Sequence, residues 1–272
     1  FELFDLNPRD YFNYKKKKIH CKYFWDDKTR FTAFSENKKF IKEVKKKFNV
    51  DESSVNKYLK KAKIKFDLTE KIFLKKSLHK FSSFLNIETI KALFNLNIFQ
   101  INRTLNQVNS DELKNKYLIQ VFDRYATYNG SSPYKTPGMM TLIQHLENHY
   151  GTFIPDGGMY EITNAIFKLA KQVGVKFHFD CNVDEIILEK NNARKIRVNE
   201  KLIESDIIVS NVDVNFTYNQ LLKQKFKHRS LKNESSSSAL IFYWGIKGTY
   251  DELDLHNVFL SLIHISEPTR PR

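Results

Sequence analysis

Two adjacent glycines at the start of a helical pattern are the first residues whose type and spacing suggest a binding role. Gly157 and Gly158 follow Pro155 and Asp156 in a turn cluster. Glycine lets the backbone approach another group closely, because it carries no side chain. From Met159 onwards, apolar residues recur at spacings of three and four, which is typical of a helix with one apolar face. The pattern predicts a turn that contacts a partner through its backbone and then a helix.

Side chains that could perform catalysis form no recognisable constellation. His145 and His149 lie one helical turn apart, but they lack the Glu-rich partner helix that would favour a metal site. His20 and Cys21 are adjacent, without a further Cys/His pair at metal-ligand spacing. The eight glycines contain no G-x-G-x-x-G pattern, and there is no nucleophile elbow. The sequence alone therefore predicts no metal and identifies no catalytic residue.

The segment around the glycine turn has the element order of half a nucleotide-binding domain. Helical periodicity gives way to alternation, then to a meander, and finally to a continuous apolar run typical of a strand buried on both faces. The expected elements are a helix at 159–173 ended by Gly174, a strand at 175–179, a hairpin of 184–189 and 194–198 around Asn191 and Asn192, and a buried strand at 207–209. The other half of such a domain must come from elsewhere.

The remaining segments predict a small sheet interrupted by a long helical region. Residues 19–25 and 31–34 flank a turn and predict a hairpin, which a strand at 239–246 should rejoin. Helices are expected to begin at Ser35, at Asp51 or Ser53, at Pro137-Gly138 and at Asp213. Further helices are expected near 69–84, 87–101 and 110–123. The expected fold class is α/β with α+β character.

Composition restricts the classes of partner. The 272 residues carry a formal net charge of +14, and residues 36–66 hold eleven lysines against four acidic residues. Such a region can meet nucleic acid or anionic lipid, or it can be a solvated surface whose lysines reflect an AT-rich genome. Two cysteines fit a reducing compartment. No apolar run reaches the ~18–20 residues of a spanning helix, so any membrane contact is expected to be peripheral.

Several stretches together resemble a known family. They are PDGGM at 155–159, VKFHFDCNVDEII at 175–187, DIIVSNVD at 206–213, DRYATYNGSSPYKTP at 123–137, SALIFYWGIK at 238–247 and DLHNVF at 254–259. Over residues 1–259 the chain resembles the carotenoid desaturases, the phytoene desaturase family of FAD-dependent oxidoreductases. It looks most like the subgroup that desaturates 1-hydroxycarotenoids at the 3,4 position.

The resemblance implies an enzyme that removes a hydride and a proton from an acyclic carotenoid, with FAD as cofactor. The fold implied is a flavoprotein with a mixed substrate-domain sheet and a helical insertion. The cofactor-binding residues implied are Gly157, Gly158, Met159, Val183 and Asn211. The residues implied to border the substrate are Tyr125, Tyr128, Pro133 and Tyr134.

Alternatives stay open at this stage. Phytoene desaturase or carotenoid isomerase would use the same scaffold on another substrate. A basic, non-enzymatic protein that binds RNA or lipid is the alternative from another class, although it leaves the order of elements at 151–213 unexplained. The family reading implies a carotenoid and a membrane surface as partners, no nucleic acid, and a place in the bacterial cytoplasm peripherally associated with the inner membrane.

We expect the sequence to be an internal fragment, inactive alone, because it begins at Phe1 and lacks the glycine loop that would hold the FAD pyrophosphate. Residues 260–270 resemble the translation of a library adaptor, and we expect a non-native tail there. The expected division is substrate sheet at 1–34, helical region facing substrate or membrane at 35–150, FAD-binding part at 151–213, return to the sheet at 214–259, and tail at 260–272.

Overall fold

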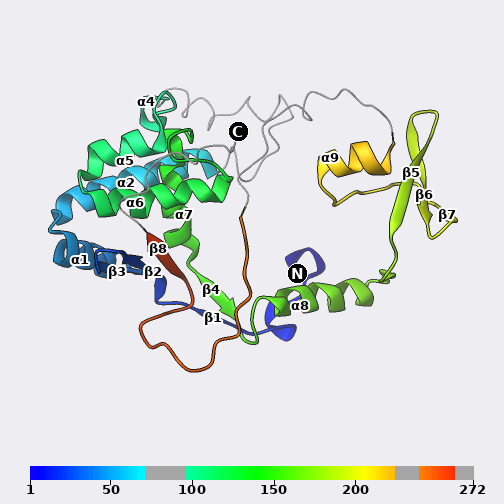
Figure 1. Ribbon diagram of the computed structural model, residues 1–272, viewed down its shortest axis with the longest axis horizontal. Coiled ribbons are helices and arrows are strands. Elements are labelled where there is room, and N and C mark those ends of the chain that lie inside the picture. Colours follow the sequence, from blue (N-terminus) through cyan, green and yellow to red (C-terminus); the bar gives the residue numbers. More distant parts are fainter. Residues whose placement is uncertain (71–95, 224–238, 261–272) are drawn as a thin grey trace. The chain divides into compact units, whose positions relative to one another are not determined.

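The computed structural model describes residues 1–70, 96–223 and 239–260, and it divides the chain into two compact units (Figure 1). The first unit comprises Phe1–Thr163 with Ser236–Arg272, and the second comprises Asn164–Ser235. Helices and sheets occur in both, which confirms the expected mixed fold class. Within the described residues, no helix combines the length and apolar character needed to cross a membrane.

The main sheet of the first unit has the strand order β3-β2-β8. Strand β2 (Ile19–Trp25) pairs antiparallel with β3 (Arg30–Phe34), which confirms the predicted hairpin. Its other edge pairs in parallel with β8 (Asn257–Leu260). The prediction that residues 239–246 rejoin this hairpin is therefore wrong. That segment forms no strand, and its apolar side chains are exposed, because β8 occupies the edge of β2.

Helix α1 (Asn37–Phe48) packs on β3 of this sheet, and α2 (Glu52–Thr69) packs against α1. The Asp51 carboxylate caps α2 by accepting hydrogen bonds from the backbone N–H groups of Ser53 and Ser54, as the sequence predicts. Ser35 does not cap α1, because its hydroxyl donates to the Lys18 carbonyl at 3.1 Å. The cap position of α1 belongs to Glu36 instead.

The core of the first unit forms where α1 and α2 meet the β2–β3 hairpin and the later helices. Aromatic rings account for much of it, with Phe31 and Phe40 packed edge to face at 5.6 Å. The fully buried residues of this cluster include Cys21, Tyr23, Trp25, Phe31, Val44, Val55, Phe66, Leu118, Val121 and Phe122. Burial of this apolar area is the main favourable term in folding this unit.

Three helices follow the undescribed segment: α4 (Leu96–Phe99), α5 (Leu105–Leu113) and α6 (Lys116–Asp123). The prediction of a single helix near 110–123 is wrong, because the helix is interrupted between α5 and α6. Lys114 adopts a left-handed conformation with φ 53°, and the Asn115 side chain caps α6. The helices predicted near 69–84 and 87–101 lie largely outside the described residues.

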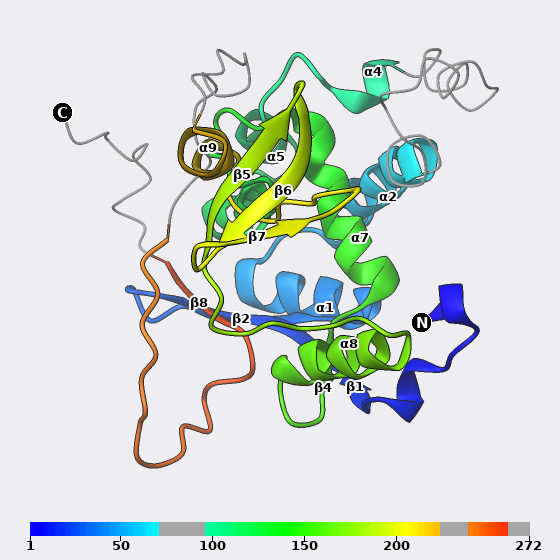
Figure 2. The ribbon, with the colours of Figure 1, turned by 90° about the vertical axis from the view of Figure 1, so that its right-hand side faces the viewer.

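A turn region leads from α6 to the end of the first unit. The 3-10 segment η5 (Arg124–Asn129) ends at Gly130, which has φ 57°, the left-handed conformation of a turn. Segment η6 (Gly138–Thr141) continues into α7 (Leu142–Tyr150), which packs beside α2 (Figure 2). Strand β4 (Phe153–Pro155) then pairs antiparallel with β1 (Tyr14–Lys16), which follows two short 3-10 turns, Glu2–Phe4 and Pro8–Asp10.

Helix α8 (Tyr160–Gln172) starts in the first unit and continues into the second. Gly174 ends it as predicted, with φ 89°. The Val175 N–H donates to the Ala170 carbonyl at 2.9 Å and the Gly174 N–H donates to the Lys171 carbonyl at 3.1 Å. This pair of bonds defines a Schellman cap, which requires the left-handed conformation that glycine adopts without strain.

The second unit contains an antiparallel meander of β5 (Val183–Glu189), β6 (Asn192–Val198) and β7 (Lys201–Glu204), seen side by side in Figure 2. The predicted hairpin is confirmed, and its two-residue turn has positive φ at Lys190 and Asn191, as a type I′ turn requires. Asp213 caps α9 (Val214–Phe216), which continues as the π-helical turn η7 (Thr217–Leu221).

Two predicted strands of the second unit are absent from its described residues. Residues 175–179 form no ladder, although Phe177 and Phe179 both pack on Phe167 of α8, with ring centroids 4.5 and 5.9 Å away. Residues 207–209 are not a buried strand either, since Ile207 is 78% and Val209 85% exposed. The backbone N–H and C=O groups of an isolated extended segment have no partner strand to bond with. These two runs therefore need neighbouring strands to become part of a sheet.

Candidate functional site

The glycine turn is an exposed, left-handed backbone segment directly before α8. Gly157 has φ 89° and Gly158 has φ 96°. A Cβ atom at Gly158 would meet no atom within 4 Å, so the glycine is needed for its conformation and leaves open space beside it. Met159 is 65% exposed. Gly158 therefore leaves space for a ligand, whereas a Cβ atom at Gly157 would lie 3.1 Å from Glu161 Cγ. The assignment of Gly157, Gly158 and Met159 to FAD stays a prediction.

The other two residues predicted to bind the cofactor belong to the second unit. Val183 is the first residue of β5 and pairs with Val198 of β6. Asn211 lies exposed in the extended segment before α9. The structure places Val183 on a sheet edge and Asn211 outside any sheet. Their assignment to the cofactor also stays a prediction.

The tyrosines predicted to border the substrate gather around η5. Tyr125 is buried and stacks on the half-exposed ring of Tyr128, with centroids 5.9 Å apart. Tyr134 and Pro133 are partly buried in the following turn, and the Pro133 carbonyl accepts a hydrogen bond from the N–H of Asn106 in α5. The structure thus brings Tyr125 and Tyr128 together and anchors the turn of Pro133 on α5. Their role in binding substrate stays a prediction.

Arg124 connects these tyrosines to the core. Its Nε donates to the Tyr23 hydroxyl at 2.7 Å, and its Nη2 lies 3.5 Å from the Glu147 carboxylate. Tyr125 donates its hydroxyl proton to the same carboxylate at 2.5 Å. The guanidinium also lies 4.7 Å from the Tyr125 ring centre and 5.9 Å from that of Tyr128. A single buried cation therefore orders both tyrosines.

The protonation states in this cluster suit orientation rather than nucleophilic attack. Burial raises the pKa of both the Tyr23 and the Tyr125 phenol well above the ordinary value, so both stay neutral hydrogen-bonding groups. Burial also raises the pKa of the Cys21 thiol to about 11, which leaves it without the thiolate that reacts. His20 binds Thr152 through Nδ1 at 2.5 Å, and burial lowers the pKa of its imidazole.

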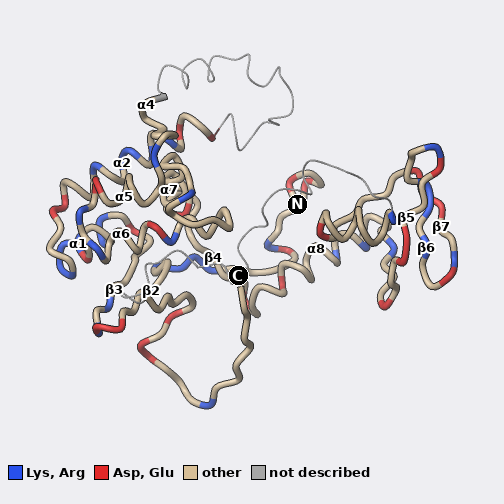
Figure 3. Tube along the Cα trace, turned by 45° about the horizontal axis from the view of Figure 1, so that its top comes forward, with Lys and Arg blue, Asp and Glu red and all other residues tan. Residues whose placement is uncertain are grey.

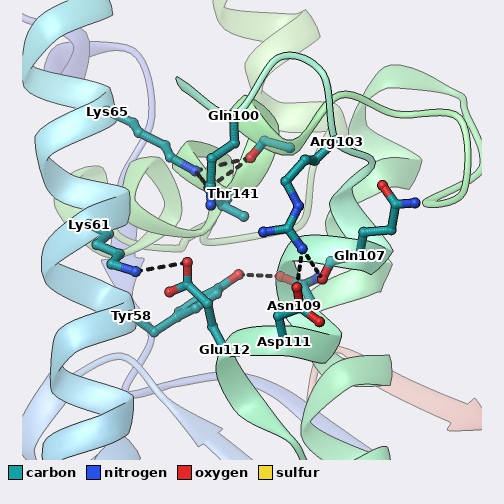
Figure 4. A network of polar contacts seen from close by, with 11 residues as sticks. Tyr58, Lys61, Lys65, Gln100, Arg103, Gln107, Asn109, Asp111, Glu112 and Thr141 are labelled. Carbon is teal, nitrogen blue, oxygen red and sulfur yellow. Dashed lines mark hydrogen bonds and ion pairs between the residues drawn. The ribbon is translucent and has the colours of Figure 1, made fainter. Parts of the chain in front are cut away.

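A second buried network surrounds Lys65, deep between α2 and η6 (Figure 4). Its ammonium group donates to the Gln100 side-chain oxygen at 2.7 Å, the Thr141 hydroxyl at 2.8 Å and the Gly138 carbonyl at 3.2 Å. Lys65 is 2% exposed, and burial lowers its pKa to about 8. Three neutral acceptors satisfy its three protons, so the ammonium ties α2 to the segments on either side.

A chain of hydrogen bonds runs from α2 through α5 to α6. Tyr58 donates its hydroxyl to the Asn109 side-chain oxygen at 2.6 Å, as Figure 4 shows. The Asn109 amide donates to Asp123 at 2.7 Å, and Asn106 donates to the other carboxylate oxygen at 2.6 Å. Burial raises the pKa of Asp123, although both amide bonds oppose that shift. This network fixes the end of α6, from which η5 and its tyrosines begin.

Sequence reasoning missed Arg124, Glu147 and the buried position of Lys65. Arg124 lies within residues 123–137, one of the stretches that resemble the family. A charged residue near aromatic residues was the only sequence signal that could have identified it. Lys65 falls three residues after Ala62 on the buried side of α2, so its helical position could have identified it. In the described part of the chain, no group of three or more His, Cys, Asp or Glu side chains could hold a metal ion.

Comparison with known proteins assigns the chain to a family. Residues 2–240 match the model of the flavin-containing amine oxidoreductases. The 1-hydroxycarotenoid 3,4-desaturase of Flavobacterium sp. (strain P99-3) is 44% identical over 251 residues, which are 92% of this chain and 51% of that protein. The 4,4'-diapolycopene oxygenase of Methylomonas sp. is 27% identical over 94% of this chain and 52% of its own length.

A solved oxidoreductase from Methanosarcina mazei aligns with 48% of this chain and 33% of its own, at 22% identity and a TM-score of 0.34, which is too weak to support a fold argument. The chain spans about half the length of the curated relatives that it matches. The predicted resemblance is confirmed. The chain belongs to the flavin-containing amine oxidoreductase family, and its relatives place it in the phytoene desaturase group.

Proposed function

We propose that the protein represented by this chain is an FAD-dependent carotenoid desaturase that acts on an acyclic hydroxycarotenoid. The observation that carries the proposal is the 44% identity, over 92% of the chain, to a 1-hydroxycarotenoid 3,4-desaturase. Desaturation removes a hydride and a proton from adjacent carbons and adds one double bond to the polyene. The non-enzymatic alternative is not favoured, because it does not account for the family match over residues 2–240.

The family description names a flavin, and FAD is our finer proposal. Bound flavin would supply the hydride acceptor. Gly157, Gly158 and Met159 would hold it by backbone contact, and the open, left-handed turn fits such an approach. For Val183 and Asn211 the proposal of flavin binding rests on the resemblance alone. None of these residues is assigned a proton-transfer role.

The aromatic residues around η5 would serve an apolar substrate. A carotenoid offers almost no polar group, so its affinity must come from buried apolar area, at about 25 cal/mol per Å². Tyr125 and Tyr128 present stacked rings that Arg124 holds in place. Arg124 is therefore a positioning residue in this proposal, and Pro133 and Tyr134 extend the same border.

We also propose that the protein works at the cytoplasmic face of a bacterial inner membrane, bound peripherally. The support is chemical: the proposed substrate partitions into lipid, so the enzyme must meet it at a membrane surface. Oligomeric state has no bearing on this proposal.

A hybrid protein tests the function. The chain is joined to the half of the Flavobacterium relative that it does not cover and expressed in a bacterium that accumulates a 1-hydroxycarotenoid. We expect the purified hybrid to carry flavin, seen by its absorbance, and the extracted pigment to absorb at longer wavelength. The intact relative is the positive control. A hybrid that carries flavin but leaves the pigment unchanged would refute the proposed substrate, and a folded hybrid without flavin would refute the proposed cofactor site.

A further inference from the structure

Helix α1 carries lysines along the side that faces away from the core. Lys38, Lys42, Lys45 and Lys46 follow the spacing i, i+4, i+7, i+8, which places them on one side of the helix. All four are exposed, and Figure 3 shows the basic residues along α1. The opposite side buries Phe40, Ile41 and Val44 in the core. We call the four lysines the α1 stripe.

Acidic residues nearby do not neutralise the α1 stripe. Residues 36–48 contain six lysines and two glutamates, and six minus two leaves a charge of +4. Glu36 pairs with Lys39 at 3.0 Å, and Glu43 is half-buried. None of the four stripe lysines forms an ion pair with any residue in the described ranges 1–70, 96–223 and 239–260. Asp51 interacts electrostatically with Lys45. One carboxylate against four lysines still leaves the stripe with a net positive charge toward solvent.

We propose that the α1 stripe docks the protein on the anionic headgroups of a phospholipid bilayer. The inference rests on the proposed function, since a desaturase of a lipid-soluble polyene must meet its substrate at a membrane. The stripe extends over nine residues, about 12 Å of helix, so its four ammonium groups can meet one plane together. Each lysine near an anionic surface adds to the attraction, which weakens as salt rises.

The same surface fits nucleic acid poorly. Residues 36–66 contain lysine but no arginine, the residue that recognises phosphates and bases in a bidentate way. Stacking on single-stranded bases would need exposed aromatic rings. Phe40, Tyr58 and Phe66 of α1 and α2 are all buried. Diffuse attraction to lipid headgroups is the recognition that these residues support.

The test compares two variants of the full chain, each with four lysines changed to glutamine. The stripe variant carries Lys38→Gln, Lys42→Gln, Lys45→Gln and Lys46→Gln. The control variant loses the same charge from exposed sites of the second unit: Lys168→Gln, Lys176→Gln, Lys190→Gln and Lys201→Gln. Both are sedimented with vesicles of phosphatidylcholine, with or without phosphatidylglycerol, at low and physiological salt, and circular dichroism checks their folding.

We expect the chain to bind only those vesicles that contain phosphatidylglycerol. The affinity of the stripe variant should be lower by on the order of a thousandfold, and that of the control variant nearly unchanged. Equal losses in both variants, or no binding by the parent chain, would overturn the proposal. A short RNA that displaces the vesicles and loses affinity only with the stripe variant would assign the surface to nucleic acid instead. Conversion of the pigment by the hybrid in detergent should not depend on the stripe lysines. The proposed function and the proposed docking surface can therefore fail separately.

Discussion

Replacing Lys65 by methionine should change how the stability of the first unit depends on pH. The Lys65 side chain is buried, and burial lowers its pKa from 10.5 to about 8. In the unfolded chain the amine regains its ordinary pKa. Between pH 8 and 10.5 the unfolded state therefore holds a proton that the folded state has lost. Stability must rise with pH across this window, because the unfolded state binds more protons.

The size of the effect follows from the pKa difference. One pKa unit corresponds to about 1.4 kcal/mol, and the folded-state amine is half protonated at pH 8, so between pH 8 and about pH 10 Lys65 adds about 2 kcal/mol to the free energy of unfolding. Below pH 8 the ammonium is charged in both states, and its burial opposes folding. The Lys65→Met variant lacks this titration while every other group remains. The difference in unfolding free energy between the two proteins should therefore change by about 2.5 kcal/mol from pH 7 to about pH 10.

Urea unfolding at both pH values measures this difference, with Trp25 fluorescence as the signal. Trp25 is buried, whereas Trp244 is already exposed and should change little. Lys60→Met, an exposed lysine on the same helix, is the matched control and should show no pH-dependent difference. A Lys65→Met difference that stays constant with pH would show that the amine reaches water in the folded protein. The hydrogen bonds of Lys65 in Figure 4 would then not describe the protein in solution.

Four further substitutions have defined outcomes. Gly158→Ala and Gly174→Ala should each lower the free energy of unfolding by roughly 1–2 kcal/mol in thermal unfolding, because both glycines have positive φ. Only Gly158→Ala should weaken flavin binding by the hybrid. If the two variants bind flavin equally well, the cofactor assignment is contradicted. Tyr58→Phe leaves the Asn109 oxygen without its donor and should cost about 1–3 kcal/mol, so an unchanged urea midpoint would count against that bond. Asp51→Ala removes the α2 cap and should cost about 1 kcal/mol by the same urea assay; no loss would mean that the cap does not contribute.

Local chemistry predicted most helix ends and turns correctly. Asp51 caps α2, Gly174 ends α8 and Asp213 begins α9, as expected. The two hairpins follow from turn residues between strand-like runs. Each of these features depends on interactions within a few residues of the chain, which sequence spacing describes directly. The break at Lys114 and Asn115 was missed, although Asn115 is a common capping residue.

Burial of charged residues was harder to predict. Lys65 was counted among eleven lysines of a basic region, yet the fold buries it among neutral acceptors. Arg124 and Glu147 are separated by 23 positions and meet because α7 packs near η5. The predicted cofactor and substrate residues could be proposed from motifs, but their contacts with ligands remain predictions.

What the sequence alone determined is the family, the mixed fold class and the elements whose ends are set by caps and turns. Tertiary structure alone decided which strands pair. The apolar runs at 207–209 and 239–246 predict strands, but β2 pairs with Asn257–Leu260 instead, and both runs lie exposed. Apolar character indicates that a segment favours burial. The choice of its partner strand depends on backbone hydrogen bonds with residues far away in the chain.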